Sequence, residues 1–215
     1  MKRGILYLIL LGFVLINPVF GQEPDYAKLG IDISDGNIPA GLKAGEKAPG
    51  FTGYDQAGTQ TELKNLIAKG PVVLFFYRGK WSAECSSYLN NLQDSVNIIS
   101  DLGASLVAIT PESIENVEQT VKFHKLTFRV IYDCQEKIMM DYLLMYTVTR
   151  EYQEKIKTSL SIDIAANNGR ETAHLPVTGT YIISREGMIT AAFTDPDFSK
   201  RASVKWIIRN LASAL

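Results

Sequence analysis

The sequence predicts an α/β fold in which a central sheet carries helices on both faces. Three short runs of mostly apolar residues, at 72–77, 105–110 and 128–132, show little polar alternation. Such runs are typical of strands that are buried on both sides of a parallel sheet. Segments with helical spacing separate them, and this β-α-β-α-β alternation favours parallel pairing. With the later strands added, we expect a mixed sheet of about five strands.

The chain begins with a segment typical of a secretory signal peptide. Lys2 and Arg3 precede an apolar core at 5–16, and small residues stand near its end. This core is shorter than the roughly 20 apolar residues that a membrane span needs. We therefore expect residues 1–21 to be removed and the mature protein to be exported, to the periplasm or the extracellular space. An uncleaved anchor is the alternative.

Composition narrows the range of partners and cofactors. The 215 residues include 22 basic and 23 acidic side chains, a net charge of −1, so we expect neither nucleic acid nor an anionic membrane as a partner. The sequence has no glycine-rich phosphate loop, and neither of its two histidines has a partner at metal-ligand spacing. We therefore expect no cofactor and no metal.

The remaining chain is expected to form one domain. Residues 22–44 are rich in glycine, proline and aspartate and predict an irregular arm, followed by the domain at 45–215. Short extended pieces flank a turn at 55–58, and Thr61 can cap a short helix. A strand at 175–183 and a partner at 188–193 predict a hairpin. Helical spacing recurs at 113–125, 133–144, 149–160 and 202–214.

The first buried strand leads into the segment that carries the chemistry. After a loop at 78–81, apolar residues recur at spacings of three and four up to Ile99, which predicts a helix. Cys85 is therefore expected in or beside the first turn of a helix, at the carboxyl end of a buried strand. Unpaired N–H groups and the positive end of the helix dipole stabilise a thiolate there, and the thiolate is the reactive form.

Neighbouring side chains are expected to adjust the acidity of Cys85. Arg78 and Lys80 add positive charge, and Ser82 can donate a hydrogen bond to the sulfur or to a substrate oxygen. Glu84 acts against them, because an adjacent carboxylate raises the pKa of a thiol. The pattern indicates a reactive cysteine, with an inert helix cysteine as the alternative. Arg78 can equally serve as a solvated loop residue or a structural ion-pair partner.

Four segments form a set of motifs in a fixed order. They are GEKAPGF at 45–51, FYRGKWSAEC at 76–85, LPVTGTYII at 175–183 and DPDFSKR at 195–201. This set resembles the AhpC/TSA (alkyl hydroperoxide reductase/thiol-specific antioxidant) family of peroxiredoxin-like proteins, in the thioredoxin superfamily. The order of strands, reactive loop and helices also resembles the thioredoxin fold.

The resemblance implies a thiol peroxidase. Cys85 falls on the peroxidatic cysteine and Ser82 on the supporting Thr/Ser, and the expected substrates are hydrogen peroxide or alkyl hydroperoxides. A thioredoxin-like protein or a small thiol is expected to regenerate Cys85. The family also implies an insertion at 146–174 that caps the site. A homodimer is possible, and the sequence does not decide the oligomeric state.

Two positions depart from the family pattern. The subgroup of the family that the 76–85 segment resembles most typically reads F-Y-R-G-x-W-C-P-x-C. Ser82 replaces the first cysteine of its C-P-x-C motif, which removes a C-x-x-C pair and disfavours a thioredoxin-like disulfide exchanger. Thr178 stands where typical members carry an arginine that supports the thiolate, and Arg78 becomes the candidate cation. Two alternatives therefore stay open. One is a degenerate thioredoxin-fold binding or scaffold domain without peroxidase activity, and the other is a single-cysteine thiol-disulfide oxidoreductase.

Cys134 follows the third predicted strand and so lies at the same sheet edge as Cys85. In the thioredoxin-like order the strand at 105–110 separates the two cysteines by two strand spacings, ~10 Å. A disulfide needs Cα atoms within ~7 Å, so a resting Cys85–Cys134 bridge is not expected. Cys134 remains a possible resolving cysteine after local opening. A residue at the start of a helix is the favoured interpretation.

Overall fold

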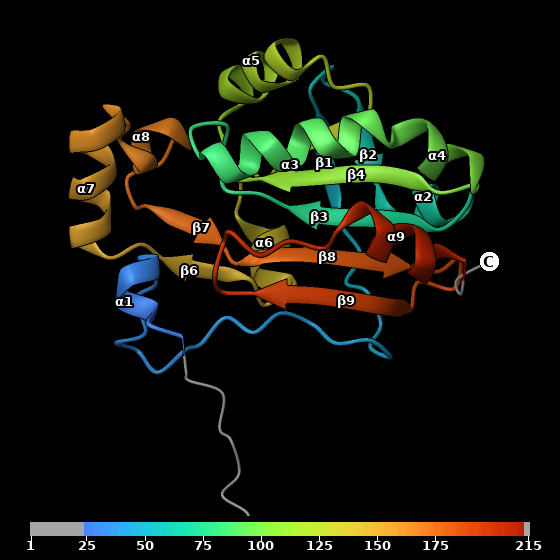
Figure 1. The fold of residues 1–215 in the computed structure, drawn as a ribbon, viewed down its shortest axis with the longest axis horizontal. Coiled ribbons are helices and arrows are strands. Elements are labelled where there is room, and N and C mark those ends of the chain that lie inside the picture. The colour runs from blue at the N-terminus through green and yellow to red at the C-terminus, as the bar shows by residue number, and fades with distance from the viewer. Residues whose placement is uncertain (1–23, 213–215) are drawn as a thin grey trace, which may run out of the picture.

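A seven-stranded mixed sheet forms the centre of the molecule (Figure 1). The computed structural model describes residues 24–212, so the signal peptide expected at 1–21 lies outside the described residues. The strand order is β2-β1-β5-β4-β3-β8-β9. Over the described part of the chain, none of the helices combines the length and the apolar character that crossing a membrane requires.

The three predicted core strands form the parallel middle of this sheet. They are β3 (Val72–Phe76), β4 (Ser105–Thr110) and β5 (Arg129–Tyr132), and β4 lies between the other two. Every residue of β3 is buried, as its apolar run predicts. The prediction of a parallel core with helices on both faces is confirmed, and the carboxyl ends of β3 and β5 are held apart by β4.

The sheet is wider than the five strands expected, because antiparallel strands extend both of its edges. On one side β1 (Thr52–Asp55) pairs with β5, and β2 (Gln60–Glu62) pairs with β1. On the other side β8 (Thr178–Ile183) pairs with β3, and β9 (Ile189–Asp195) pairs with β8. The two strands at the first edge are the short extended pieces expected beside the turn at 55–58, and with only four and three residues they carry no pattern that places them in the main sheet.

Helices cover both faces of the sheet and bury one core against each (Figure 1). One face carries α3 (Ala83–Asp94), α4 (Val96–Asp101), α5 (Ile114–His124) and α9 (Val204–Leu211). The other face is covered by α2 (Leu63–Ile67) and α6 (Lys137–Asp141), and the core on this side extends to α7 (Arg150–Leu160) and α8 (Ile164–Asn167) at one end of the sheet. Alternate residues of β3 enter the two cores, as the pleat of a strand requires.

Several predicted helices differ from the observed ones for local reasons. The helix expected from Cys85 to Ile99 is interrupted at Ser95, whose hydroxyl donates to the Asn91 carbonyl oxygen at 2.9 Å, a bond that bends helices. The helix expected at 133–144 is shorter, because Glu136 adopts a left-handed φ of 59° just before α6. Glu62 rather than Thr61 is the N-cap of α2.

The segment expected as an insertion, 146–174, forms a separate layer at one end of the sheet. Strands β6 (Met145–Thr147) and β7 (His174–Pro176) pair antiparallel and enclose α7 and α8. Figure 1 shows α7 and α8 beyond the end of the sheet toward which β3 and β4 point, near the start of α3. The arm expected to be irregular contains one short helix, α1 (Tyr26–Leu29).

Candidate active site

Cys85 is the third residue of α3, and α3 begins soon after β3 ends. Ser82 is the N-cap residue and has an extended backbone, so the chain turns into the helix directly after it. The side chain of Cys85 is fully buried, at 0% exposure, and the thiol is free. A buried strand and the first turn of a helix thus position this sulfur.

An arginine from near the carboxyl terminus donates a hydrogen bond to this sulfur. Arg201 Nη2 lies 3.2 Å from Cys85 Sγ. The same guanidinium donates to the carbonyl oxygens of Phe198, at 3.0 Å, and Phe76, at 3.4 Å. It also lies over the ring of Tyr88, 5.3 Å from the centroid. These contacts fix a positive charge against the thiol at the end of β3.

Arg78 forms a second, buried layer of positive charge. Its Nη1 donates to the Tyr152 hydroxyl and its Nη2 to Ser82 Oγ, both at 3.0 Å. The guanidinium stacks on the ring of Phe198 at 3.6 Å and is only 1% exposed. Arg78 is therefore not a solvated loop residue. Tyr152 belongs to α7, so the 146–174 segment contacts the site through this arginine.

These charges decide the ionisation of Cys85. Burial raises the pKa of the thiol, whereas the positive charges of Arg201 and then Arg78, with hydrogen bonds from Ser82 and the Arg78 backbone, lower it. The net pKa of Cys85 lies below its ordinary value, which favours the nucleophilic thiolate. The geometry thus provides the electrostatic setting that the sequence predicts, with Arg201 as an additional and more influential cation.

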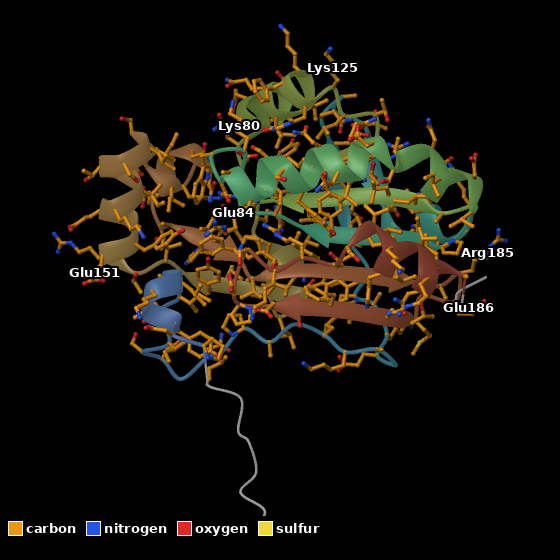
Figure 2. All side chains as sticks on the ribbon, viewed as in Figure 1. Lys80, Glu84, Lys125, Glu151, Arg185 and Glu186 are labelled. Carbon is orange, nitrogen blue, oxygen red and sulfur yellow. The ribbon has the colours of Figure 1, made fainter. Side chains whose placement is uncertain are left out.

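Glu84, which Figure 2 labels at the start of α3, completes the polar network together with Ser82. Ser82 Oγ donates to Glu84 Oε2 at 2.8 Å, and the same carboxylate oxygen lies 4.0 Å from Arg78 Nη2. Ser82 thus links Arg78 to Glu84, and a hydrogen bond from Ser82 also contributes to lowering the pKa of Cys85. Donation from Ser82 to a peroxide oxygen stays a prediction.

The loop between β3 and α3 is held by a buried carboxyl group. Glu112 Oε1 accepts a hydrogen bond from the Lys80 backbone N–H at 3.1 Å, and burial raises the pKa of Glu112. Gly79 has a φ of 152°, and a Cβ there would lie 2.4 Å from Trp81 Nε1. Only glycine fits this position without displacing the loop that connects Arg78 to Ser82.

Comparison with known proteins assigns the chain to a family. Residues 44–192, more than half of the chain, match the AhpC/TSA family. The chain belongs to the AhpC/TSA family. The matched segment includes Arg78, Ser82 and Cys85, whereas Arg201 lies beyond it.

Two curated proteins that are named as peroxiredoxins are similar to this AhpC/TSA protein. A putative peroxiredoxin of Mycobacterium tuberculosis is 27% identical over 94 residues, 44% of this chain and 61% of that protein. The chloroplastic peroxiredoxin Q of Sedum lineare is 26% identical over 123 residues, 57% and 66% of the two chains. The chain thus spans slightly less than two thirds of each relative's length.

A solved structure shows the fold. The crystal structure of peroxidoxin BcpB from Mycobacterium tuberculosis superposes with a TM-score of 0.65 and 17% sequence identity. The match covers 81% of this chain and 99% of BcpB. The AhpC/TSA protein therefore has the thioredoxin-like α/β fold that the motif order predicts.

Arg201 is the site residue that sequence reasoning missed. It lies 116 residues from Cys85 along the chain, so no spacing rule connects the two. The only signal was its place as the last residue of the fourth motif, at 195–201, to which no chemistry was assigned. The expected cation, Arg78, is present, but Arg201 is the one that touches the sulfur.

Thr178 positions the segment that carries Arg201. Its hydroxyl lies 3.0 Å from the Asp195 carbonyl oxygen and 3.3 Å from the Lys200 carbonyl oxygen, and its side chain is buried. Lys200 precedes Arg201 directly. Thr178 occupies the strand position at which the family pattern expects an arginine. It thus anchors the loop that places Arg201 at the sulfur.

Replacing Thr178 by valine is expected to raise the pKa of Cys85, because the loop that holds Arg201 loses its hydroxyl anchor. The same change should lower the free energy of unfolding by about 1 kcal/mol. Thr178→Ser keeps the hydroxyl and should restore the low pKa, which a thiolate absorbance titration measures. Equal thiol pKa values in Thr178→Val and the unaltered protein would show that Thr178 does not position Arg201.

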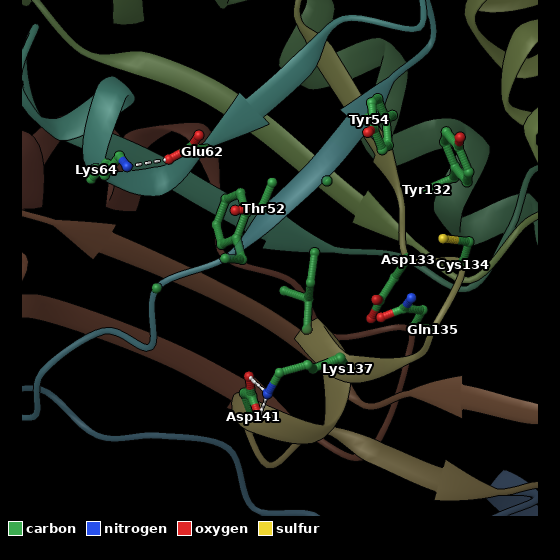
Figure 3. Close-up of a pocket in the computed structure, with 14 residues that line it drawn as sticks. Thr52, Tyr54, Glu62, Lys64, Tyr132, Asp133, Cys134, Gln135, Lys137 and Asp141 are labelled. Carbon is green, nitrogen blue, oxygen red and sulfur yellow. Dashed lines mark hydrogen bonds and ion pairs between the residues drawn. The ribbon is translucent and has the colours of Figure 1, made fainter.

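Cys134 lies apart from this network. It is an exposed free thiol in the turn between β5 and α6, three residues before α6 begins, so it is not the start of that helix. It lines a pocket of about 540 Å³ together with Tyr54, Tyr132 and Lys137 (Figure 3). Strand β4 separates its strand from β3, and a role for Cys134 as a resolving cysteine stays a prediction.

Proposed function

We propose that this AhpC/TSA protein is a thiol peroxidase that reduces hydrogen peroxide or alkyl hydroperoxides through Cys85. One observation carries the proposal: the buried Cys85 sulfur accepts a hydrogen bond from Arg201, and positive charge lowers its pKa. A thiolate that is held by a guanidinium is suited to attack a neutral peroxide, because the charge is stabilised without being neutralised by a proton.

The chemistry follows from the placement of these groups. The Cys85 thiolate attacks the distal oxygen of the hydroperoxide, an S–O bond forms, and the O–O bond breaks. The leaving oxygen takes up a proton and departs as water or an alcohol, and Cys85 becomes a sulfenic acid. Arg201 already contacts the sulfur, so it is placed to stabilise negative charge that moves toward the leaving oxygen.

An external thiol is proposed to regenerate Cys85. One thiol condenses with the sulfenic acid, forming a mixed disulfide and releasing water, and a second thiol attacks that disulfide and releases Cys85. A thioredoxin-like protein or two molecules of a small thiol supply the two equivalents. Cys134 is exposed in the turn after β5, and β5 is not adjacent to β3, which supports an external rather than an internal source.

We further propose that the protein acts outside the cytoplasm. The support is the pattern at residues 1–21, in which two basic residues precede a short apolar core. Fractionation of cells that produce the full chain, with the mass of the mature protein, tests this proposal. A protein that keeps residues 1–21 and stays in the cytoplasm would contradict it.

The peroxidase proposal is tested by mixing purified, reduced protein with hydrogen peroxide in a stopped-flow instrument. We expect the protein to consume about one equivalent of peroxide without added reductant, and a sulfenic-acid probe such as dimedone to label Cys85. A thiol that titrates near or above ~8.5 without reacting would favour the scaffold alternative. Mixed disulfides with small thiols and no peroxide consumption would favour the oxidoreductase alternative.

A further inference from the structure

The buried sulfur of Cys85 poses the question of how a peroxide reaches it. On one side lies Arg78, which is itself sealed between the ring of Phe198 and the hydroxyl of Tyr152. On the other side lies Arg201, which is only partly buried. Of the two arginines, Arg201 is thus the one that contacts both the sulfur and solvent. The surface around Arg201 therefore marks a route to the thiol.

Arg201 borders a groove of about 720 Å³ between two segments of the chain. One wall is the outer side of α3, which contributes Glu84, Ser87 and Tyr88. The other wall is the stretch at 199–204 that leads into α9 and contains Arg201. Glu84 and Tyr88 flank Cys85 along α3, so the sulfur, which does not itself line the groove, belongs to the helical turn that forms this wall.

We propose that peroxides reach Cys85 through this groove, past Arg201, and that the groove selects uncharged hydroperoxides over fatty-acid hydroperoxides, which carry a carboxylate. The inference rests on the proposed peroxidase function and names the substrate class of that site. The groove supplies the entry path, and its acidic side chains supply the selection.

The lining of the groove is mixed in character. Small uncharged polar side chains line it, and they are Ser87, Asn91, Ser95, Ser199 and Ser203. Apolar surface comes from Tyr88, Ala83, Ala202 and Val204. Hydrogen bonding and apolar contact therefore do not by themselves separate one hydroperoxide from another, and the selection is left to charge.

The charge of the groove distinguishes hydroperoxides that carry a carboxylate from those that do not. Glu84 and Asp94 both line it, and both belong to α3. The charge of Arg201 is directed to the sulfur and to two carbonyl oxygens. A fatty-acid hydroperoxide brings a carboxylate, which the two acidic side chains repel. Neutral hydroperoxides meet no such repulsion.

The route is tested by filling the groove. Ser87 is exposed, lies two residues after Cys85 and lines the groove, so Ser87→Trp narrows the path without changing either arginine. We expect the rate constant for tert-butyl hydroperoxide to fall by about tenfold or more, and that for hydrogen peroxide to fall less. The thiol pKa should not change. Asn97→Trp, at an exposed position of α4 outside the groove, is the matched control and should react like the unaltered protein.

The selectivity is tested with three peroxides on the unaltered protein. Hydrogen peroxide and tert-butyl hydroperoxide should each react at least about tenfold faster than linoleic acid hydroperoxide. Asp94→Asn should speed the reaction with the fatty-acid peroxide and leave that with hydrogen peroxide unchanged. Equal rates for hydrogen peroxide and linoleic acid hydroperoxide would overturn the selectivity, and equal losses in Ser87→Trp and Asn97→Trp would overturn the route. No reaction with any of the three would instead overturn the peroxidase function, and the route with it.

Discussion

Replacing Cys85 by serine is expected to reduce peroxide consumption to the level of a protein-free solution. The two side chains are similar in size, so the buried site should still fold. A serine hydroxyl stays protonated at neutral pH and forms no counterpart of the sulfenic acid, so the first chemical step is lost. Stopped-flow rates with hydrogen peroxide measure the loss, and a thermal unfolding curve confirms that the variant is folded.

Cys134→Ser is the matched control for this experiment. Cys134 is exposed and lies after β5, away from Arg201 and Arg78, so the first turnover should proceed at the unaltered rate. If Cys134 acts as a resolving cysteine, only repeated turnover with a reductant should slow. Undiminished peroxide reduction in Cys85→Ser, or loss of the first turnover in Cys134→Ser, would contradict the proposed mechanism.

Arg201→Met is expected to have the second largest effect. The change removes both the hydrogen bond to Cys85 Sγ and the charge that most offsets burial, so the pKa of the thiol should rise. The rate constant with hydrogen peroxide at neutral pH should fall about 10²–10³-fold, the usual effect of removing a donor at a site of developing charge. Because the thiolate forms only above the raised pKa, part of the rate should return as the pH increases.

The measurements are a pH–rate profile and a thiolate absorbance titration of the same variant. Arg209→Met, at an exposed position of α9, serves as the control and should leave both unchanged. Arg201→Lys keeps the charge without the forked donors, so its rate constant and thiol pKa should lie between those of Arg201→Met and the unaltered protein. An unaltered thiol pKa in Arg201→Met would show that Arg78 alone sets the acidity of Cys85.

Local patterns carry the fold prediction. An uninterrupted apolar run identified β3, and apolar residues at spacings of three and four identified α3, so the place of Cys85 at their junction was also predictable. Turn residues at 55–58 likewise marked the short extended pieces that form β1 and β2, although these strands are too short to show that they join the main sheet. The same patterns missed the break at Ser95, because that break comes from a hydroxyl bonded to the turn before it.

The site was predictable only as far as neighbouring residues define it. Arg78, Ser82 and Cys85 lie within eight positions, and the structure brings them into one network. Arg201 and Tyr152 reach that network through the tertiary fold, from the segment after β9 and from α7. Sequence spacing contains no information about such contacts, so the decisive cation was overlooked.

The complete enclosure of the Cys85 sulfur divides the proposed cycle into two stages with different demands on space. A peroxide molecule is small enough to arrive beside Arg201 while the surrounding helices stay in place. A cysteine of a reducing protein is not, because its own backbone must approach within disulfide reach of a group that has no exposed surface. When the reductant is a protein, each cycle must therefore include a transient loosening around α3 or the 199–204 stretch, and with abundant reductant the frequency of that loosening would set the pace of the cycle.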